Sequence, residues 1–173
     1  MFSFLYVILC LAGIVPLVFL AGCLLPKQRV VERKIKINAP LERVWDTVTD
    51  IANQGDWRSD LEYVKVIEDT NGKLIWEEKP CKGKSILFEE VEKVDCSTYR
   101  IKIIESSFNE GHWIGRFSFN HNQTTFISRE CIIIKNPMVR LMSYFIISVD
   151  KLVETYQQDL KEFLETSNNS NIK

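Results

Sequence analysis

Arg116 and Glu130 are the charged residues best placed to orient a ligand inside a folded domain. They fall on neighbouring predicted strands, 112–120 and 124–135. Both side chains could point inward and hold the polar head of a ligand. The alternative is a cross-strand ion pair on the solvated face of the sheet, which is where most such charges are found.

Other groups that could move protons are few. The only histidines are His112 and His121. His121 stands in a predicted turn and is expected in solvent. His112 alternates with Trp113 along its strand, so a half-exposed position on the opposite face is expected. In the adjacent pairs Glu77-Glu78 and Glu89-Glu90, alternation sends one carboxyl to each face, so one of each pair is expected to be partly buried.

Familiar catalytic and metal-binding motifs are absent from the sequence. It contains no glycine-rich phosphate loop, H-E-x-x-H, G-x-S-x-G or EF-hand pattern. Its five cysteines are widely spaced and form no C-x-x-C pair, which argues against a disulfide framework and against a zinc site. We therefore predict no catalytic residue, no cofactor and no metal.

Apolar side chains on the inward faces of the predicted elements suggest a cavity wall. Each one taken singly belongs to an ordinary core more often than to a ligand contact, but as a set they fit an apolar pocket with few polar anchors. The candidates are Trp76, Phe88, Tyr99, Ile101, Trp113, Phe117, Phe126, Met142, Tyr144 and Phe145.

Charge is distributed unevenly along the chain. All 22 basic and 23 acidic residues follow residue 26, and the formal net charge is −1. The two signs are well mixed and no basic block of five occurs, so the sequence gives little support to nucleic-acid binding.

Residues 1–26 carry no charged side chain. As a helix they would extend about 35–39 Å, against roughly 30 Å for a bilayer core. One hypothesis is an uncleaved single-span anchor. Basic residues follow only its C-terminal side, beginning with Lys27 and Arg29, so the positive-inside rule places the domain in the cytoplasm.

A second hypothesis for this segment is a cleaved export signal. Leu20-Ala21-Gly22-Cys23 resembles the lipobox of bacterial lipoproteins, in which the cysteine, here Cys23, is lipidated and becomes the new N-terminus. A secretory signal normally begins with basic residues, and residues 1–5 contain none, which favours the anchor. Both hypotheses place the domain at a membrane surface.

The hydrophobic period changes at Ala39-Pro40 and again after Asn136-Pro137. Residues 31–37 alternate apolar with charged side chains, as in a half-buried strand, and residues 41–51 recur at helical spacing. The predicted order is a strand, two short helices, six antiparallel strands and one helix of about seven turns. The strands are predicted at 61–69, 73–78, 84–94, 99–103, 112–120 and 124–135, and the last helix at about 138–164.

These elements predict an α+β fold in which a curved antiparallel sheet of about seven strands closes around a long C-terminal helix. Such an arrangement rarely packs solid at both ends, so we expect a cavity. The predicted organisation is a membrane anchor or lipoprotein-type signal at 1–26, a folded domain at 27–168 and a polar tail at 169–173.

Several motifs resemble the SRPBCC superfamily, the START-like helix-grip group that includes polyketide cyclase/dehydrase and lipid-transport proteins. The opening residues match it, followed by a Gly-x-Trp strand and a threonine-led strand ending in glutamate. In this chain they are Val31-Glu32-Arg33, Ile35, Ile37, Ala39-Pro40, Val44-Trp45, Asp50 and Trp57, then Gly111-His112-Trp113, and Thr124 or Thr125 to Glu130; Leu24-Leu25-Pro26 precedes them as in some relatives. The resemblance implies a cavity for an apolar or amphipathic molecule such as a lipid, sterol-like compound, quinone or polyketide, without metal or nucleotide.

Three functions remain open at this level. The first is a membrane-tethered, non-catalytic module that binds or transports a hydrophobic small molecule or lipid. The second is a cyclase or dehydratase, which needs at least two inward ionisable groups near one point; cyclising relatives use Arg, Tyr, His or Asp in this way, but no such set can be transferred residue by residue. The third is an interaction scaffold at the membrane, with a filled interior and an exposed apolar patch.

Overall fold

The computed structural model describes residues 14–67, 73–107, 109–146 and 148–170, with side chains described as far as residue 166. Residues 14–24 are helical. The elements that follow are β1 (Gln28–Ile37), α2 (Leu41–Thr49), the 3₁₀ helix η1 (Ile51–Asp56), β2 (Leu61–Ile67), β3 (Ile75–Pro80), β4 (Ile86–Val94), β5 (Thr98–Glu105), β6 (Glu110–Asn120), β7 (Gln123–Ile133), α3 (Pro137–Ile146) and α4 (Val149–Ser170).

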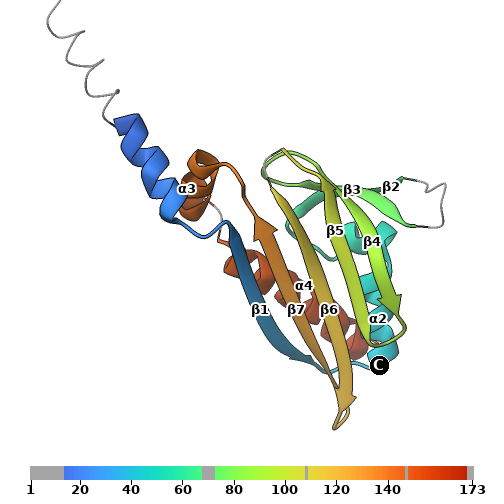
Figure 1. The fold of residues 1–173 in the computed structure, drawn as a ribbon. Coiled ribbons are helices and arrows are strands. Elements are labelled where there is room, and N and C mark those ends of the chain that lie inside the picture. Colours follow the sequence, from blue (N-terminus) through green and yellow to red (C-terminus); the bar gives the residue numbers. More distant parts are fainter. Residues whose placement is uncertain (1–13, 68–72, 108, 147, 171–173) are drawn as a thin grey trace, which may run out of the picture.

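All seven strands form one antiparallel sheet in the order β1-β7-β6-β5-β4-β3-β2. Consecutive strands are neighbours except for β1, which pairs with β7. α2 and α4 lie on the same face of the curved sheet (Figure 1). The predicted α+β architecture is therefore confirmed, while the hairpin predicted at Asn71-Gly72 lies outside the described residues.

The switch from β1 to α2 follows the change of period in the sequence. Ile37 is fully buried at the end of β1, and Pro40 precedes the first residue of α2. The carbonyl of Pro40 accepts a hydrogen bond from the amide of Val44 at 3.1 Å, which closes the first helical turn. Val44, Trp45 and Val48 then form the buried stripe that packs into the core.

Polar contacts fix α4 against the inner face of the sheet. The buried Gln157 amide donates to the carbonyl of Arg33 at 2.9 Å and to Ser128 Oγ at 2.8 Å. Nearer the C-terminus, Glu165 accepts a hydrogen bond from the amide of Asn38 at 2.8 Å. These bonds hold α4 in register with β1 and β7, and the inner face of α4 then completes the hydrophobic core.

The prediction of one long C-terminal helix is wrong in one respect, because the structure has two helices there. Asn136 begins α3 by accepting a bond from the amide of Met138 at 2.9 Å. Ser148 begins α4 in the same manner, since its Oγ accepts from the amide of Lys151 at 3.3 Å. These two side chains give each helix its own N-terminal cap, which ends the continuous helix that the apolar stripe predicted.

α3 packs on the N-terminal helix and not under the sheet (Figure 1). Arg140 is 2% exposed, and its guanidinium donates to the carbonyls of Gly22 at 2.9 Å and Ile134 at 3.2 Å. A Cβ at Gly22 would lie 2.1 Å from the carbonyl oxygen of Pro137, so glycine permits this close approach.

None of the helices in the described part of the chain has the length and apolar character needed to cross a membrane. Residues 1–13, the first half of the predicted span, lie outside the described residues.

Candidate functional site

The inner face of the sheet, toward α4, is lined with aromatic rings. Phe117 and Phe126 stack on β6 and β7 with ring centroids 4.9 Å apart. Tyr156 of α4 meets Trp57 edge-on at 5.1 Å and Trp113 of β6 at 5.8 Å. These contacts join the two sides of the core and create a low-polarity surrounding for any charged group among them.

Arg58 is the best-connected charged group in this interior. It follows η1, and its guanidinium makes a bidentate ion pair with Asp60, through Nε at 3.1 Å and Nη2 at 2.8 Å. Its Nη1 atom donates to Gln54 at 2.9 Å and to Glu78 at 3.0 Å. Burial alone would lower the pKa of Arg58, but the charges of Glu78 and Asp60 outweigh it and raise the pKa above its ordinary value.

Glu78 of β3 is 6% exposed and uses both carboxylate oxygens. One accepts from Arg58, and the other accepts from the indole nitrogen of Trp76 at 2.9 Å. Because the side chains of Arg58 and Glu78 are only 11% and 8% exposed and both carboxylate oxygens are used, this is a satisfied, largely buried ion pair that joins the end of η1 to β3.

Two tyrosines add polar groups to this interior, Tyr156 from α4 and Tyr99 from β5. The guanidinium of Arg58 lies 5.2 Å from the ring centre of Tyr156, and burial raises the pKa of that phenol. Tyr99 of β5 is 1% exposed, and its hydroxyl has no hydrogen-bond partner in the described part of the structure. Burial raises the pKa of Tyr99 most, and the nearby carboxylate of Glu90 raises it further.

Glu130 stands on the inner face of β7, level with Trp113 of β6. Burial raises its pKa to about 8, and the like charge of Glu78 adds to the effect while Arg58 opposes it. No group among the described residues donates a hydrogen bond to this carboxyl. A carboxyl with this pKa is largely protonated at pH 7, so it can donate a hydrogen bond as well as accept one.

We define the interior polar cluster as Arg58, Glu78, Tyr99, Glu130 and Tyr156. The first two residues satisfy each other, while Tyr99 and Glu130 keep free hydrogen-bonding capacity among the described residues. The cluster therefore combines a fixed ion pair, Arg58 with Glu78, and two polar groups, those of Tyr99 and Glu130, that can contact a further molecule.

Most residues predicted from the sequence to face inward do so. Trp76, Tyr99, Ile101, Phe117 and Phe126 are buried in the core, and Phe88 and Trp113 pack against it. Of the two adjacent glutamate pairs, Glu78 is buried, and Glu89 pairs on the other face with Lys73 and Lys102.

Other predicted positions need correction. Arg116 points to the outer face, where its side chain is 51% exposed and lies 3.9 Å from Glu32. This is the solvated cross-strand ion pair that formed the alternative. Met142, Tyr144 and Phe145 are exposed on α3, because that helix packs on residues 14–24 and not under the sheet.

The sequence gives little indication that three members of the cluster, Arg58, Tyr156 and Glu78, belong to it. Arg58 lies in a loop after η1, where no periodicity indicates which way a side chain points. Tyr156 belongs to the apolar stripe of the last helix, which predicts only a place in the core. Alternation predicts one partly buried carboxyl in the Glu77-Glu78 pair, but spacing alone does not identify its partner.

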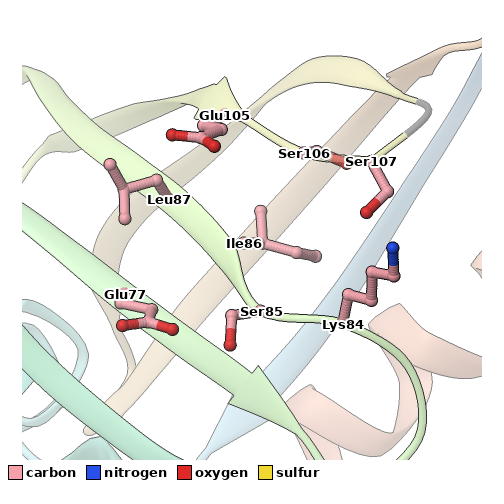
Figure 2. A pocket seen from close by; sticks show the side chains of 8 residues that line it. All are labelled: Glu77, Lys84, Ser85, Ile86, Leu87, Glu105, Ser106 and Ser107. Carbon is pink, nitrogen blue, oxygen red and sulfur yellow. The ribbon is translucent and has the colours of Figure 1, made fainter.

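A pocket of about 430 Å³ lies outside this cluster, at the end of the sheet where β3 and β5 finish and β4 begins (Figure 2). It is lined by Glu77, Lys84, Ser85, Ile86, Leu87, Glu105, Ser106 and Ser107. Its walls are mixed in polarity, and it shares no residue with the interior polar cluster. α3 leaves the sheet at this same end, where β7 finishes.

In the described ranges, no three His, Cys, Asp or Glu side chains stand close enough to hold a metal ion. Cys23, Cys81, Cys96 and Cys131 are free thiols there, and Cys10 lies outside the described residues.

Residues 28–129 match the model of the family described as polyketide cyclase / dehydrase and lipid transport. The chain belongs to this family. The match begins at β1 and ends inside β7, and so it covers most of the sheet, the Arg58 loop and Tyr99. Glu130 and Tyr156 lie beyond it. No curated protein matches the chain.

Solved structures confirm the helix-grip fold predicted from the resemblance. TTHA0849 from Thermus thermophilus is 19% identical, with a TM-score of 0.68 over 80% of this chain and 99% of that one. A norcoclaurine synthase mutant from Thalictrum flavum, in complex with a transition-state analogue, has 10% identity and a TM-score of 0.65 over 82% and 96%. The ZhuI aromatase/cyclase from Streptomyces sp. R1128 has 14% identity and a TM-score of 0.60 over 79% and 96%. At these identities the likeness concerns the fold.

The ion pair of Arg58 predicts that replacing this arginine costs much more stability than replacing the exposed Arg116. Arg58→Met leaves the buried carboxylate of Glu78 without its counter-ion, so we expect a loss of about 3–5 kcal/mol in the free energy of unfolding. Arg116→Met removes an exposed pair and is expected to cost less than about 1 kcal/mol. Chemical denaturation of the wild type and the two variants in the same detergent measures the free energy of unfolding of each. Equal losses of this free energy in the two variants would contradict the assigned role of Arg58.

Glu130 predicts a pH dependence of a particular sign. Its pKa is about 8 in the folded chain, against 4.5 for an ordinary glutamate, so the folded state holds the proton more tightly. Proton binding by Glu130 therefore contributes fully to the free energy of unfolding below about pH 4.5, and this contribution is lost as the pH rises through about 8. We expect the Tm of the wild type to fall across this window, and Glu130→Gln to flatten the fall.

Thermal scans at several pH values measure this effect. Glu105→Gln, at an exposed position on β5, is the matched control and should keep the wild-type profile. An identical pH profile for Glu130→Gln and the wild type would show that Glu130 has an ordinary pKa.

Proposed function

We propose that this protein is a membrane-tethered module that binds a hydrophobic small molecule bearing a polar group, beside the interior polar cluster between α4 and the sheet. The observation that carries the proposal is the buried Tyr99 hydroxyl, which has no hydrogen-bond partner among the described residues and lies within an aromatic lining. The half-buried Glu130 carboxyl, whose pKa burial raises to about 8, is the second inward polar group. The family, which includes lipid-transport proteins, supports binding of an apolar ligand.

The chemistry of the two groups indicates what the ligand offers. An unpartnered buried hydroxyl costs free energy, and a bound molecule that accepts its proton in a hydrogen bond removes that cost. Tyr99 donates a hydrogen bond, and protonated Glu130 does the same. The ligand is therefore an apolar body with a hydrogen-bond acceptor such as a carbonyl, as in a quinone, a polyketide-like molecule or a lipid ester.

A binding role without catalysis is the simpler interpretation of the cluster. Arg58 and Glu78 are fully engaged with each other and with Asp60, Gln54 and Trp76, so they serve as a scaffold. Tyr99 and Glu130 are weak acids for which no hydrogen bond is found among the described residues, and such groups suit recognition.

One observation favours an enzyme of the cyclase or dehydratase type as the second candidate. A carboxyl with a pKa of about 8 can give and take protons near neutral pH, as a general acid or base must. The solved aromatase/cyclase shares the fold, and its name gives the class of reaction that this alternative implies; norcoclaurine synthase shows that a second enzyme has the same fold.

The tether is proposed from residues 1–26, which carry no charge and precede the basic residues Lys27 and Arg29. Arg140 supports the uncleaved form of the anchor, for which the basic residues place the domain in the cytoplasm. It donates to the carbonyl of Gly22, the residue that would be removed if processing exposed Cys23 for lipidation. An exported lipoprotein, modified at Cys23, is the alternative form of the tether.

Native mass spectrometry of the full chain, purified from membranes in mild detergent, tests the binding function. We expect a small molecule to copurify with the wild type. Loss of one hydrogen bond should weaken its retention about 2- to 10-fold in Tyr99→Phe. Tyr63→Phe is the control, since Tyr63 is exposed on β2 and bonds to Glu77. A wild type without any bound molecule, or equal retention in both variants, would contradict the proposal.

The same copurified molecule separates binding from catalysis. Non-catalytic binding predicts that its mass stays constant during prolonged incubation with the wild type. A dehydratase predicts the loss of one water from the mass of the molecule, and a cyclase without dehydration predicts an isomer of equal mass with a different chromatographic retention time; Glu130→Gln should abolish either change while the molecule remains bound.

A further inference from the structure

α3 presents large apolar side chains to solvent. Phe145 is 81% exposed and Ile146 is 71% exposed, and Met138 and Met142 are also exposed on this helix. A ten-residue helix of a folded domain normally turns such residues inward. Here the inward side of α3 holds Arg140 and Ser143, so the polarity of the helix is inverted.

The helix formed by residues 14–24 continues this apolar surface. Leu17 is 66% exposed and Leu24 is 80% exposed. This helix lies beside α3 through the Gly22–Pro137 contact and the bond from Arg140 to the Gly22 carbonyl (Figure 1). We call the exposed apolar side chains of α3 and of residues 14–24 the apolar ledge. Its members are Ile14, Val15, Leu17, Phe19, Leu20, Leu24, Met138, Met142, Phe145 and Ile146.

The charges around the apolar ledge fit an anionic lipid surface. Neither helix contains an acidic residue, and the sole charge of α3, Arg140, bonds to backbone carbonyls inside. The basic Lys27 stands where the ledge meets the sheet, with its carbonyl bonded to the amide of Ile134. The guanidinium of Arg29 lies 4.4 Å from the ring centre of Tyr144, a pairing suited to the headgroup region.

We infer that α3 lies along the bilayer surface, with Met138, Met142, Phe145 and Ile146 among the acyl chains, while residues 14–24 lead the chain into the membrane. The occupant of the apolar ledge is lipid and not another protein, because thirteen further residues without a charged side chain precede residues 14–24 in the sequence, which gives an uncharged stretch of 26 residues. This inference rests on the proposed membrane tether, to which it adds a second, amphipathic contact.

The inference gives the domain a defined orientation. α3 follows the end of β7, and the pocket of Figure 2 opens at that same end of the sheet. With α3 on the bilayer, this end faces the lipid, and the opposite end, with the β6–β7 turn, faces water. A hydrophobic ligand then has a short path between the membrane and the protein.

Fluorescence quenching by brominated lipid tests the contact in the full chain. Phe145→Trp is reconstituted into vesicles of phosphatidylcholine and phosphatidylglycerol, with either ordinary or brominated acyl chains. Three native tryptophans, Trp45, Trp57 and Trp76, are buried, and Trp113 is partly buried within the core. The introduced tryptophan adds emission to that of the wild type. We expect this added emission to lie at a shorter wavelength than that of a tryptophan in water, and to be lost in brominated vesicles.

Phe119→Trp is the matched control. Phe119 is 50% exposed on β6, next to the turn at the far end of the sheet, and the emission added there should survive bromination. Flotation of the same vesicles separates the two claims. A chain that does not float overturns the tether and the inference together. A chain that floats while the Phe145→Trp emission stays unquenched keeps the tether and overturns the bilayer contact of α3, including the case in which a protein covers it.

Discussion

The rest of the interior depends on one arginine. Arg58 pairs with Glu78 and Asp60 and bonds to Gln54, and so it ties η1 to β3 and to the residue that precedes β2. The attraction between the guanidinium and the two carboxylates offsets the hydration that these groups lose in this aromatic surrounding. Burial raises the pKa of Glu130, and the like charge of Glu78 adds to this effect. The ion pair acts on Glu130 in both directions, since the charge of Glu78 raises the pKa of that carboxyl and Arg58 lowers it.

The arrangement separates structural polarity from polarity directed at a ligand. The satisfied groups gather near η1 and β3, while the unsatisfied hydroxyl of Tyr99 comes from β5 and the half-buried carboxyl of Glu130 from β7. Aromatic rings from Trp113, Phe126 and Tyr156 lie between these strands and α4. Such a lining suits a molecule that is mostly apolar, and it agrees with a family that contains both lipid-transport proteins and cyclases.

The sequence predicts the sheet well because alternation and turns are local properties. The change of period at Ala39-Pro40 locates β1 and α2 correctly, and the alternation near Tyr99 identifies β5. The apolar stripe from Met138 onward misleads because its period continues through Ser148, where a single cap separates α3 from α4. Arg58 and the docking of α3 on residues 14–24 depend on contacts between distant segments, which no local pattern contains.

The central claim is that a ligand binds between α4 and the sheet, against Tyr99 and Glu130. A crystal structure of the full chain, purified from its own membranes with its copurified molecule, tests this claim most directly. The account predicts density for an apolar body among the aromatic rings, with an acceptor atom within hydrogen-bond distance of Tyr99 Oη or the Glu130 carboxyl. Density confined to the outer pocket of Figure 2, or an interior closed by side chains alone, would contradict it.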